Sequence, residues 1–328
     1  MNDTTPIRLT SPADLLSAIP YLLGFEPEHS LVVQGLRGNN LQCTFRVDLP
    51  GGIDHLDHLV TMTEQVKTND CDAVILIAYG ETELATACLD RAASDYAASG
   101  IQVLDRLRVT DHHWYSQNCR DGCCPPQGTP LPETTDITTA LTVAGARRHP
   151  GREAITALLD PADEHQRAAV ARAVEDDLAA ACDLSWADQC ERDLQAVDHW
   201  LGSDEPPGPD GIATLGLGLG DLRVRDYALH ASDQRRTDTR RPVDLWLWVA
   251  RHLEDDLAAP SATVAGWCAY RTGNGVLALE CFEHALKVCP NYRLAQMLTA
   301  ALQAGIPPAA LDRLTVAADG TEATSNTA

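Results

Sequence analysis

The spacing of apolar residues changes once along this chain of 328 residues, and that change constrains the fold more than any other feature. Before Asp111, segments that alternate every second residue are interspersed with segments of helical spacing, about 3.6 residues per turn. After Pro132, strand patterns almost vanish and only the helical spacing continues. The sequence therefore predicts an α/β region followed by an all-helical region.

The N-terminal region predicts a mixed β-sheet flanked by helices. Ser11 and Pro12 begin an apolar helical stripe, which Pro20 is expected to kink or end. Residues 30–36 and 41–49 predict an antiparallel hairpin, and the continuously apolar residues 72–79 predict a central strand covered on both faces. The remaining predicted elements are helices at 54–66 and 82–98 and a strand at 101–109.

The helical region divides at a cluster of Pro and Gly residues. Helices are expected near 136–148, 151–159, 162–182, 185–201, 212–230, 243–258, 261–272, 275–288 and 291–304. The predicted organisation is an α/β domain at 1–132 with a Cys/aromatic loop at 111–132, a helical region at 133–201, a linker at 202–211, a helical region at 212–315 and a disordered tail at 316–328.

Two Gly-containing segments predict close helix packing. Residues 216–220 lack the spacing of a dinucleotide loop or a P-loop, so their glycines are expected to let a helix approach a neighbour. Near the C-terminus, small and large residues fall at the offsets of a tetratricopeptide helical hairpin: Gly266, Gly273, Ala278, Phe282, Ala285 and Pro290. Only one such unit is present, whereas a solenoid needs about three. We expect a packed helical hairpin, with a partner-binding groove as the alternative.

The charge and the apolar pattern disfavour several classes of partner. The chain carries 47 acidic and 25 basic residues, for a formal net charge of −22, which repels duplex nucleic acid and anionic lipid surfaces. No apolar run approaches the roughly 18 residues of a membrane span, and residues 1–10 lack the pattern of a secretory signal. These features predict a cytoplasmic protein without a membrane segment.

Eleven cysteines are scattered along the chain without an export signal, so a disulfide framework is not expected. Five of them fall within apolar periodic segments and are predicted to be buried small hydrophobic residues: Cys43, Cys71, Cys88, Cys268 and Cys281.

The loop at 111–124 concentrates the side chains that bind Zn²⁺. His113, Cys119, Cys123 and Cys124 are the candidate ligands, accompanied by His112. Their spacing is poor for zinc, because Cys119 and Cys123 are separated by three residues and Cys123 and Cys124 are adjacent. A packed or redox-sensitive loop is the favoured alternative.

Two further pairs are candidate ligand-binding residues. Trp114 and Tyr115 follow a predicted strand and could stack a ligand ring, although such residues more often close a core. Arg46 and Asp48 share one strand face and could hold an anion or orient a base, but an ordinary ion pair is favoured. Residues 221–226 likewise favour an internal charge network over catalysis.

Short motifs along most of the chain, taken together, resemble the actinobacterial family DUF4192, a domain of unknown function. They are SPADLL at 11–16, PYLLGF at 20–25, SLVV at 30–33, RVDLP at 46–50, WYS at 114–116, CCPP at 123–126 with Gly128, GRE at 151–153, VRD at 224–226, WCAY at 267–270, GNG at 273–275 and AGIPP at 304–308. The resemblance implies an N-terminal α/β region and a helical C-terminal region. It implies no activity, substrate or catalytic residue.

Two kinds of function are consistent with these features. Because no pair of residues has the spacing of a catalytic mechanism, an interaction or regulatory protein that uses the helical half and the aromatic loop is favoured. The alternative is a small-molecule-binding enzyme with its site at the strand ends and the 111–124 loop. An enzyme predicts a concave pocket with converging polar groups, whereas an interaction protein predicts an exposed apolar patch or groove on the helical half.

Overall fold

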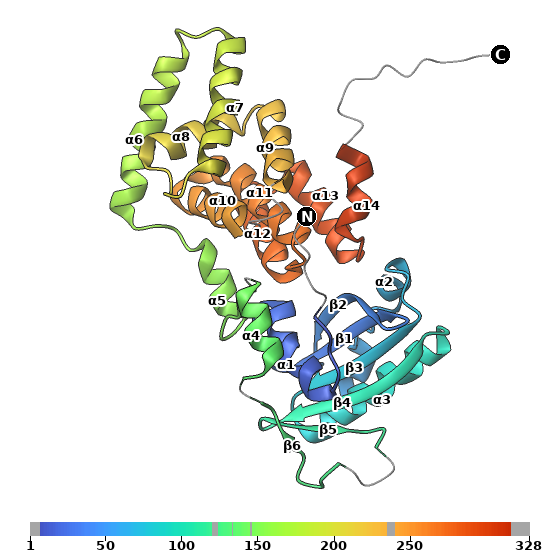
Figure 1. The fold of residues 1–328 in the computed structure, drawn as a ribbon. Coiled ribbons are helices and arrows are strands. Elements are labelled where there is room, and N and C mark those ends of the chain that lie inside the picture. Colours follow the sequence, from blue (N-terminus) through green and yellow to red (C-terminus); the bar gives the residue numbers. More distant parts are fainter. Residues whose placement is uncertain (1–6, 120–123, 133, 145, 235–239, 316–328) are drawn as a thin grey trace, which may run out of the picture.

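A computed structural model describes residues 7–119, 124–132, 134–144, 146–234 and 240–315, with a sheet at one end and a helical array at the other (Figure 1). The six strands are β1 Ser30–Arg37, β2 Asn40–Asp48, β3 Ala73–Tyr79, β4 Gln102–Thr110, β5 His113–Ser116 and β6 Thr129–Pro130. Their order is β2-β1-β3-β4-β5-β6, and all neighbours are antiparallel except the parallel pair β3 and β4. The predicted mixed sheet is confirmed.

The β1–β2 hairpin and the central position of β3 agree with the sequence prediction. Gly38 allows the hairpin turn because it adopts a φ of 56°, a region that side chains with a Cβ disfavour. In β3, Leu76 and Ile77 are fully buried although they point to opposite faces, so both faces of this strand are covered.

Strands β5 and β6 lie inside the segment that was predicted to be irregular. Asp111 and His112 adopt φ values of 49° and 58°, and two consecutive residues with positive φ turn the chain from β4 back into β5. Strands of four and two residues are too short to show alternation, which explains why the sequence pattern missed them.

The predicted helix at 54–66 is wrong. The chain forms a 3₁₀ helix η1 at Ile53–His58 and a short helix α2 at Thr63–Thr68. Between them Leu59 is extended and Met62 adopts a left-handed φ of 57°, while the hydroxyl of the buried Tyr96 donates to the Thr61 carbonyl. Tertiary contacts therefore override the helical spacing here.

Helix α1 at Pro12–Leu23 and helix α3 at Thr82–Ala98 cover opposite faces of the sheet. The Ser11 Oγ caps α1 by accepting from the Asp14 amide at 3.1 Å, as the sequence predicts. Pro20 does not end α1, which continues to Leu23 and is terminated by Gly24 with a φ of 85°.

The chain beyond β6 is helical in every described element. The helices are α4 Asp136–Val143, α5 Arg152–Thr156, η2 Ala157–Leu159, α6 Glu164–Ala181, α7 Trp186–Gly202, α8 Pro209–Gly218, α9 Leu222–Gln234, α10 Arg240–His252, η3 Asp255–Leu257, α11 Ala258–Arg271, α12 Gly275–Val288, α13 Arg293–Gln303 and α14 Pro308–Thr315. The expected helix at 212–230 is two helices, α8 and α9, and α14 was not predicted. None of the described helices has the length and apolar content needed to span a membrane.

Two glycines allow helices of the helical region to approach one another closely. A Cβ on Gly216 would lie 2.6 Å from Leu253, so the predicted close packing of α8 is confirmed. A Cβ on Gly266 would lie 2.4 Å from the ring of Phe282, where α11 crosses α12. This contact belongs to the hairpin for which tetratricopeptide-like packing was predicted, and that likeness stays a prediction.

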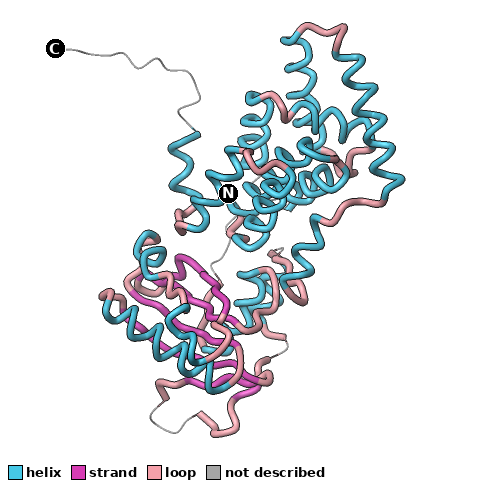
Figure 2. Tube along the Cα trace, turned by 180° about the vertical axis from the view of Figure 1, so that it is seen from behind, coloured by secondary structure: helices cyan, strands magenta, loops and turns pink. Residues whose placement is uncertain are grey.

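The sheet and the helical region are joined by packing and by hydrogen bonds. Figure 2 shows the strands at one end of the molecule and most of the helices at the other. One continuous apolar core extends from α1 and one face of the sheet into helices α5–α14, and the other face has a separate core with α3. Asn69, just after α2, donates to the carbonyl of Gly305 at 2.6 Å. Residues 203–208 connect α7 to α8, which packs against both α6 and α7. The proposed domain boundaries stay a prediction.

Candidate functional site

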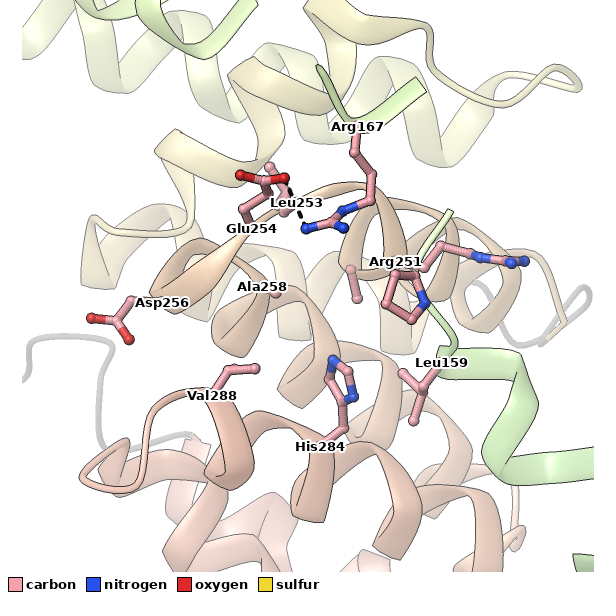
Figure 3. A pocket seen from close by; sticks show the side chains of 11 residues that line it. Leu159, Arg167, Arg251, Leu253, Glu254, Asp256, Ala258, His284 and Val288 are labelled. Atoms are coloured by element: carbon pink, nitrogen blue, oxygen red, sulfur yellow. Dashed lines mark ion pairs between the residues drawn. The ribbon is translucent and has the colours of Figure 1, made fainter. Parts of the chain in front are cut away.

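A cavity of about 470 Å³ lies in the helical half, where α6, α10, α11 and α12 meet (Figure 3). Its apolar wall consists of Leu159, Pro161, Ala250, Leu253, Ala258 and Val288. The Ala162 amide donates to the Arg251 carbonyl at 2.8 Å and the Arg251 Nε donates to the Asp160 carbonyl at 3.1 Å, so the segment between η2 and α6 is held against α10. The volume is within the range of about 300–1,000 Å³ that is typical of ligand pockets.

Polar groups from three elements converge on this cavity. Arg167, in the first turn of α6, forms an ion pair with Glu254 at 2.8 Å, and its Nε is buried with no hydrogen-bond partner among the described residues. His284 of α12 lies on the opposite side, as Figure 3 shows. Burial, assisted by the charge of Lys287, lowers the pKa of His284. Its imidazole is therefore neutral at pH 7.

The Arg46 and Asp48 side chains form an ion pair on β2, 2.6 Å between Nη2 and Oδ1. The Arg46 Nε also donates to the Oγ of the buried Ser30 at 2.8 Å, and its guanidinium lies 5.8 Å from the centre of the Phe25 ring. The Arg46 side chain is 14% exposed. These contacts correspond to the ion-pair interpretation, and binding of an anion by this pair stays a prediction.

Trp114 and Tyr115 point to opposite faces of β5. Trp114 packs against the core beneath α1, and its Nε1 is buried without a hydrogen-bond partner in the described part of the chain. The Tyr115 ring lies 4.1 Å below the Arg108 guanidinium, and its hydroxyl donates to the Gln127 carbonyl at 3.1 Å. Both rings have structural contacts, and their role in stacking a ligand stays a prediction.

The candidate zinc ligands are only partly described. His113 lies in β5, where its Nδ1 is 2.8 Å from the Asp111 carbonyl, and Cys119 and Cys124 are half-buried. Cys123 lies outside the described residues. Across the described ranges, no three His, Cys, Asp or Glu side chains gather closely enough to hold a metal ion. The zinc hypothesis therefore stays a prediction that depends on Cys123.

The five cysteines that were predicted to be buried are buried or half-buried. Burial raises the pKa of Cys43, Cys71, Cys88 and Cys281 above the ordinary value, and it raises the pKa of Cys268 to about 12. A thiol with a raised pKa is a poor nucleophile at pH 7. These five residues therefore pack in the two apolar cores and are poor candidates for a reactive thiol.

Four exposed apolar side chains belong to the end of the hairpin formed by α6 and α7 and to the first residue of α9. Figure 1 shows where these helices lie. The four residues are Leu178, Leu184, Trp186 and Leu222, which are 51%, 41%, 65% and 62% exposed. The Arg223 guanidinium lies 3.3 Å above the Trp186 ring and forms an ion pair with Asp221. We call these four apolar residues the hairpin patch.

The sequence patterns missed both the cavity and the hairpin patch. Arg167 of α6, Glu254 between α10 and η3, and His284 of α12 share no motif, so only the packing of these three segments brings them together. Trp186 had a usable signal, because it directly follows the N-cap Ser185. It is therefore at a helix end, where neighbouring helices cover little of its surface.

No curated protein and no solved structure matches the chain. The family described as Domain of unknown function (DUF4192) matches residues 12–309, from the start of α1 into α14. This match includes the sheet, the cavity and the hairpin patch, and the chain therefore belongs to the DUF4192 family.

Proposed function

We propose that this chain is an interaction or regulatory protein that binds a partner through the hairpin patch. The observation that supports this function is the exposure of Trp186, because a large aromatic side chain that stays 65% exposed beside other exposed apolar residues is typical of a protein-binding surface. On α7 the apolar stripe includes the buried Val197 and Leu201 and the half-buried Cys190, and Trp186 continues it beyond the neighbouring helices.

The charges around the hairpin patch define the chemistry of the partner. Glu175, Asp176, Asp183 and Asp188 are exposed at this end of the hairpin. The nearby Arg192 and Arg223 are already paired, with Asp177 and Asp221 respectively. A basic amphipathic segment of a partner protein matches both the apolar patch and its acidic surroundings. A second copy of this chain would bring like charges together, because each copy has a net charge of −22.

The test is fluorescence anisotropy with a labelled amphipathic helical peptide of Leu and Lys, compared with the same peptide in which Glu replaces Lys. We expect the Lys peptide to bind and the Glu peptide not to bind. Trp186→Ala should weaken binding by about 30-fold, since truncation of a central aromatic residue at an interface costs about 2 kcal/mol.

Met297→Ala is the matched control, because Met297 is 61% exposed on α13 and should leave binding unchanged. Equal binding of the two peptides would contradict the proposal, as would undiminished binding by Trp186→Ala. Concentration-dependent dimerisation in sedimentation that Trp186→Ala abolishes would instead assign the patch to a second copy.

A further inference from the structure

We propose that the cavity between α6, α10 and α12 binds a zwitterionic amino acid with an apolar side chain. The inference is independent of partner binding at the hairpin patch, because the two surfaces share no residue. It is based on the balance of charges around the cavity, on the partly exposed ion pair of Arg167 and Glu254 and on its apolar wall.

The charged residues around the cavity sum to zero. Arg167 and Arg251 contribute two positive charges, and Glu254 and Asp256 contribute two negative charges. A phosphate would approach two carboxylates, and a simple cation would approach two guanidinium groups. A ligand that carries one charge of each sign and no net charge fits this arrangement best.

The ion pair between Arg167 and Glu254 provides one partner for each end of such a ligand. The guanidinium of arginine binds carboxylates through two parallel N–H donors, and the side chain of Arg167, which lines the cavity, is 30% exposed. The ligand carboxylate would accept from the exposed part of this guanidinium, and the ligand ammonium would donate to Glu254, whose side chain is 49% exposed. The two side chains are 2.8 Å apart, which favours a free amino acid, whose charged groups are joined through one carbon, over a longer peptide.

The rest of the cavity fits the remaining parts of this ligand. Leu159, Leu253 and Val288 offer apolar contacts to an aliphatic side chain. The imidazole of His284 lies on the side opposite the ion pair, and its lowered pKa keeps it from adding a positive charge to this balance at pH 7 (Figure 3).

Isothermal titration calorimetry of the full chain with L-leucine tests the proposal. We expect saturable binding of L-leucine, and weak or no binding of N-acetyl-L-leucine, which lacks the ammonium group, and of isoamylamine, which lacks the carboxylate. Tighter binding of leucyl-leucine than of leucine would overturn the free amino acid as ligand. Equal binding of N-acetyl-L-leucine would overturn recognition of the zwitterion.

Two variants locate the binding in this cavity. Arg167→Gln and Glu254→Gln should each weaken leucine binding by about tenfold or more, because each removes one charge-assisted hydrogen bond. Arg172→Gln is the control, since Arg172 is exposed on the same helix and does not line the cavity. Glu254 is half exposed, so Glu254→Gln should fold even if Arg167→Gln does not.

The proposal is wrong if L-leucine does not bind at millimolar concentration, or if Glu254→Gln in a folded protein binds it as tightly as the unchanged chain. Trp186→Ala should leave leucine binding unchanged. Failure of this proposal is therefore distinguishable from failure of partner binding at the hairpin patch.

Discussion

The two faces of the sheet are closed in different ways. The face that packs on α3 forms a core from buried residues between Leu31 and Ile101, all close in sequence. The opposite face packs on α1 and shares a core with buried residues as far along the chain as Leu311. We call these the local core and the shared core. One face of the sheet is therefore covered by residues of the N-terminal region alone, whereas the other face is fully covered only when the helical region has folded.

This difference has a consequence for stability. Burial of apolar surface is the main favourable contribution to folding, and the shared core distributes that burial over both regions of the chain. Damage to the shared core should therefore affect the sheet and the helices together, while damage to the local core should act mainly near α3. The predictions below test this distinction, from the largest expected effect to the smallest.

Trp246→Ala should have the largest effect. Trp246 is fully buried in the shared core, and its Nε1 donates to the buried Ser232 hydroxyl at 2.9 Å. We expect the free energy of unfolding to fall by about 3–5 kcal/mol. Urea unfolding followed by far-ultraviolet circular dichroism measures the loss. If the helical region unfolds at lower urea concentration while the sheet retains its original midpoint, the shared core does not couple the two regions.

Leu76→Ala and Ile77→Ala form a matched pair. The two residues are adjacent in β3 and fully buried, but Leu76 faces the local core and Ile77 faces the shared core. Each should lower the free energy of unfolding by about 2–5 kcal/mol. Hydrogen exchange separates them: Leu76→Ala should speed exchange in α3, and Ile77→Ala in α1 and the helices. The same pattern of exchange in both variants would count against two distinct cores.

Gly266→Ala should cost less. The added methyl group would meet the ring of Phe282, and overpacking of this kind costs about 1–3 kcal/mol. The melting temperature measures the loss. Gly51→Ala is the control, because nothing lies within 4 Å of a Cβ at Gly51 and its melting temperature should stay close to that of the unchanged chain. A stable Gly266→Ala variant would show that α11 and α12 adjust without strain.

A decrease in pH should have the smallest effect. Burial lowers the pKa of His149 and of His284 in the folded chain. As pH falls below about 6.5, the unfolded chain takes up protons on these residues before the folded chain does, so stability falls. The contribution of these histidines to stability is fully present at pH values above their pKa in the unfolded chain, and it is lost as the pH falls toward their lower pKa in the folded chain. Urea unfolding at pH 7.5 and 5.5 checks this: His284→Gln should show a smaller decrease than the unchanged chain, and an equal decrease would disprove the contribution of His284.

The parts of the fold that the sequence predicted are those with strong local patterns. Ser11 and Pro12 at the start of α1, Gly38 in the hairpin turn and the apolar run of β3 each determine their structure through neighbouring residues. The helix expected at 54–66 failed because residues 59–62 follow contacts with α3 instead of their own spacing. Prediction succeeded where local and tertiary preferences agree.

The candidate site was less predictable than the fold. Arg46 and Asp48 form the ion pair that the shared strand face favours, and the five apolar-segment cysteines lie in the cores. Arg167, Glu254 and His284 carry no motif, because residues on three separate segments acquire a common environment only through packing. The hairpin patch is similar, since exposure of Trp186 depends on which neighbouring helices cover α7.

The sequence by itself determined the change from a mixed sheet to helices, the positions of most elements and the acidic net charge. Periodicity depends only on residues that are close in the chain, and net charge is a sum over all residues, so neither requires knowledge of the tertiary contacts. Only the tertiary structure decided that one face of the sheet shares its core with the helices, that a cavity with balanced charges lies between α6, α10 and α12, and that Trp186 stays exposed. These features depend on contacts between distant residues, and such contacts leave no periodic pattern in the sequence.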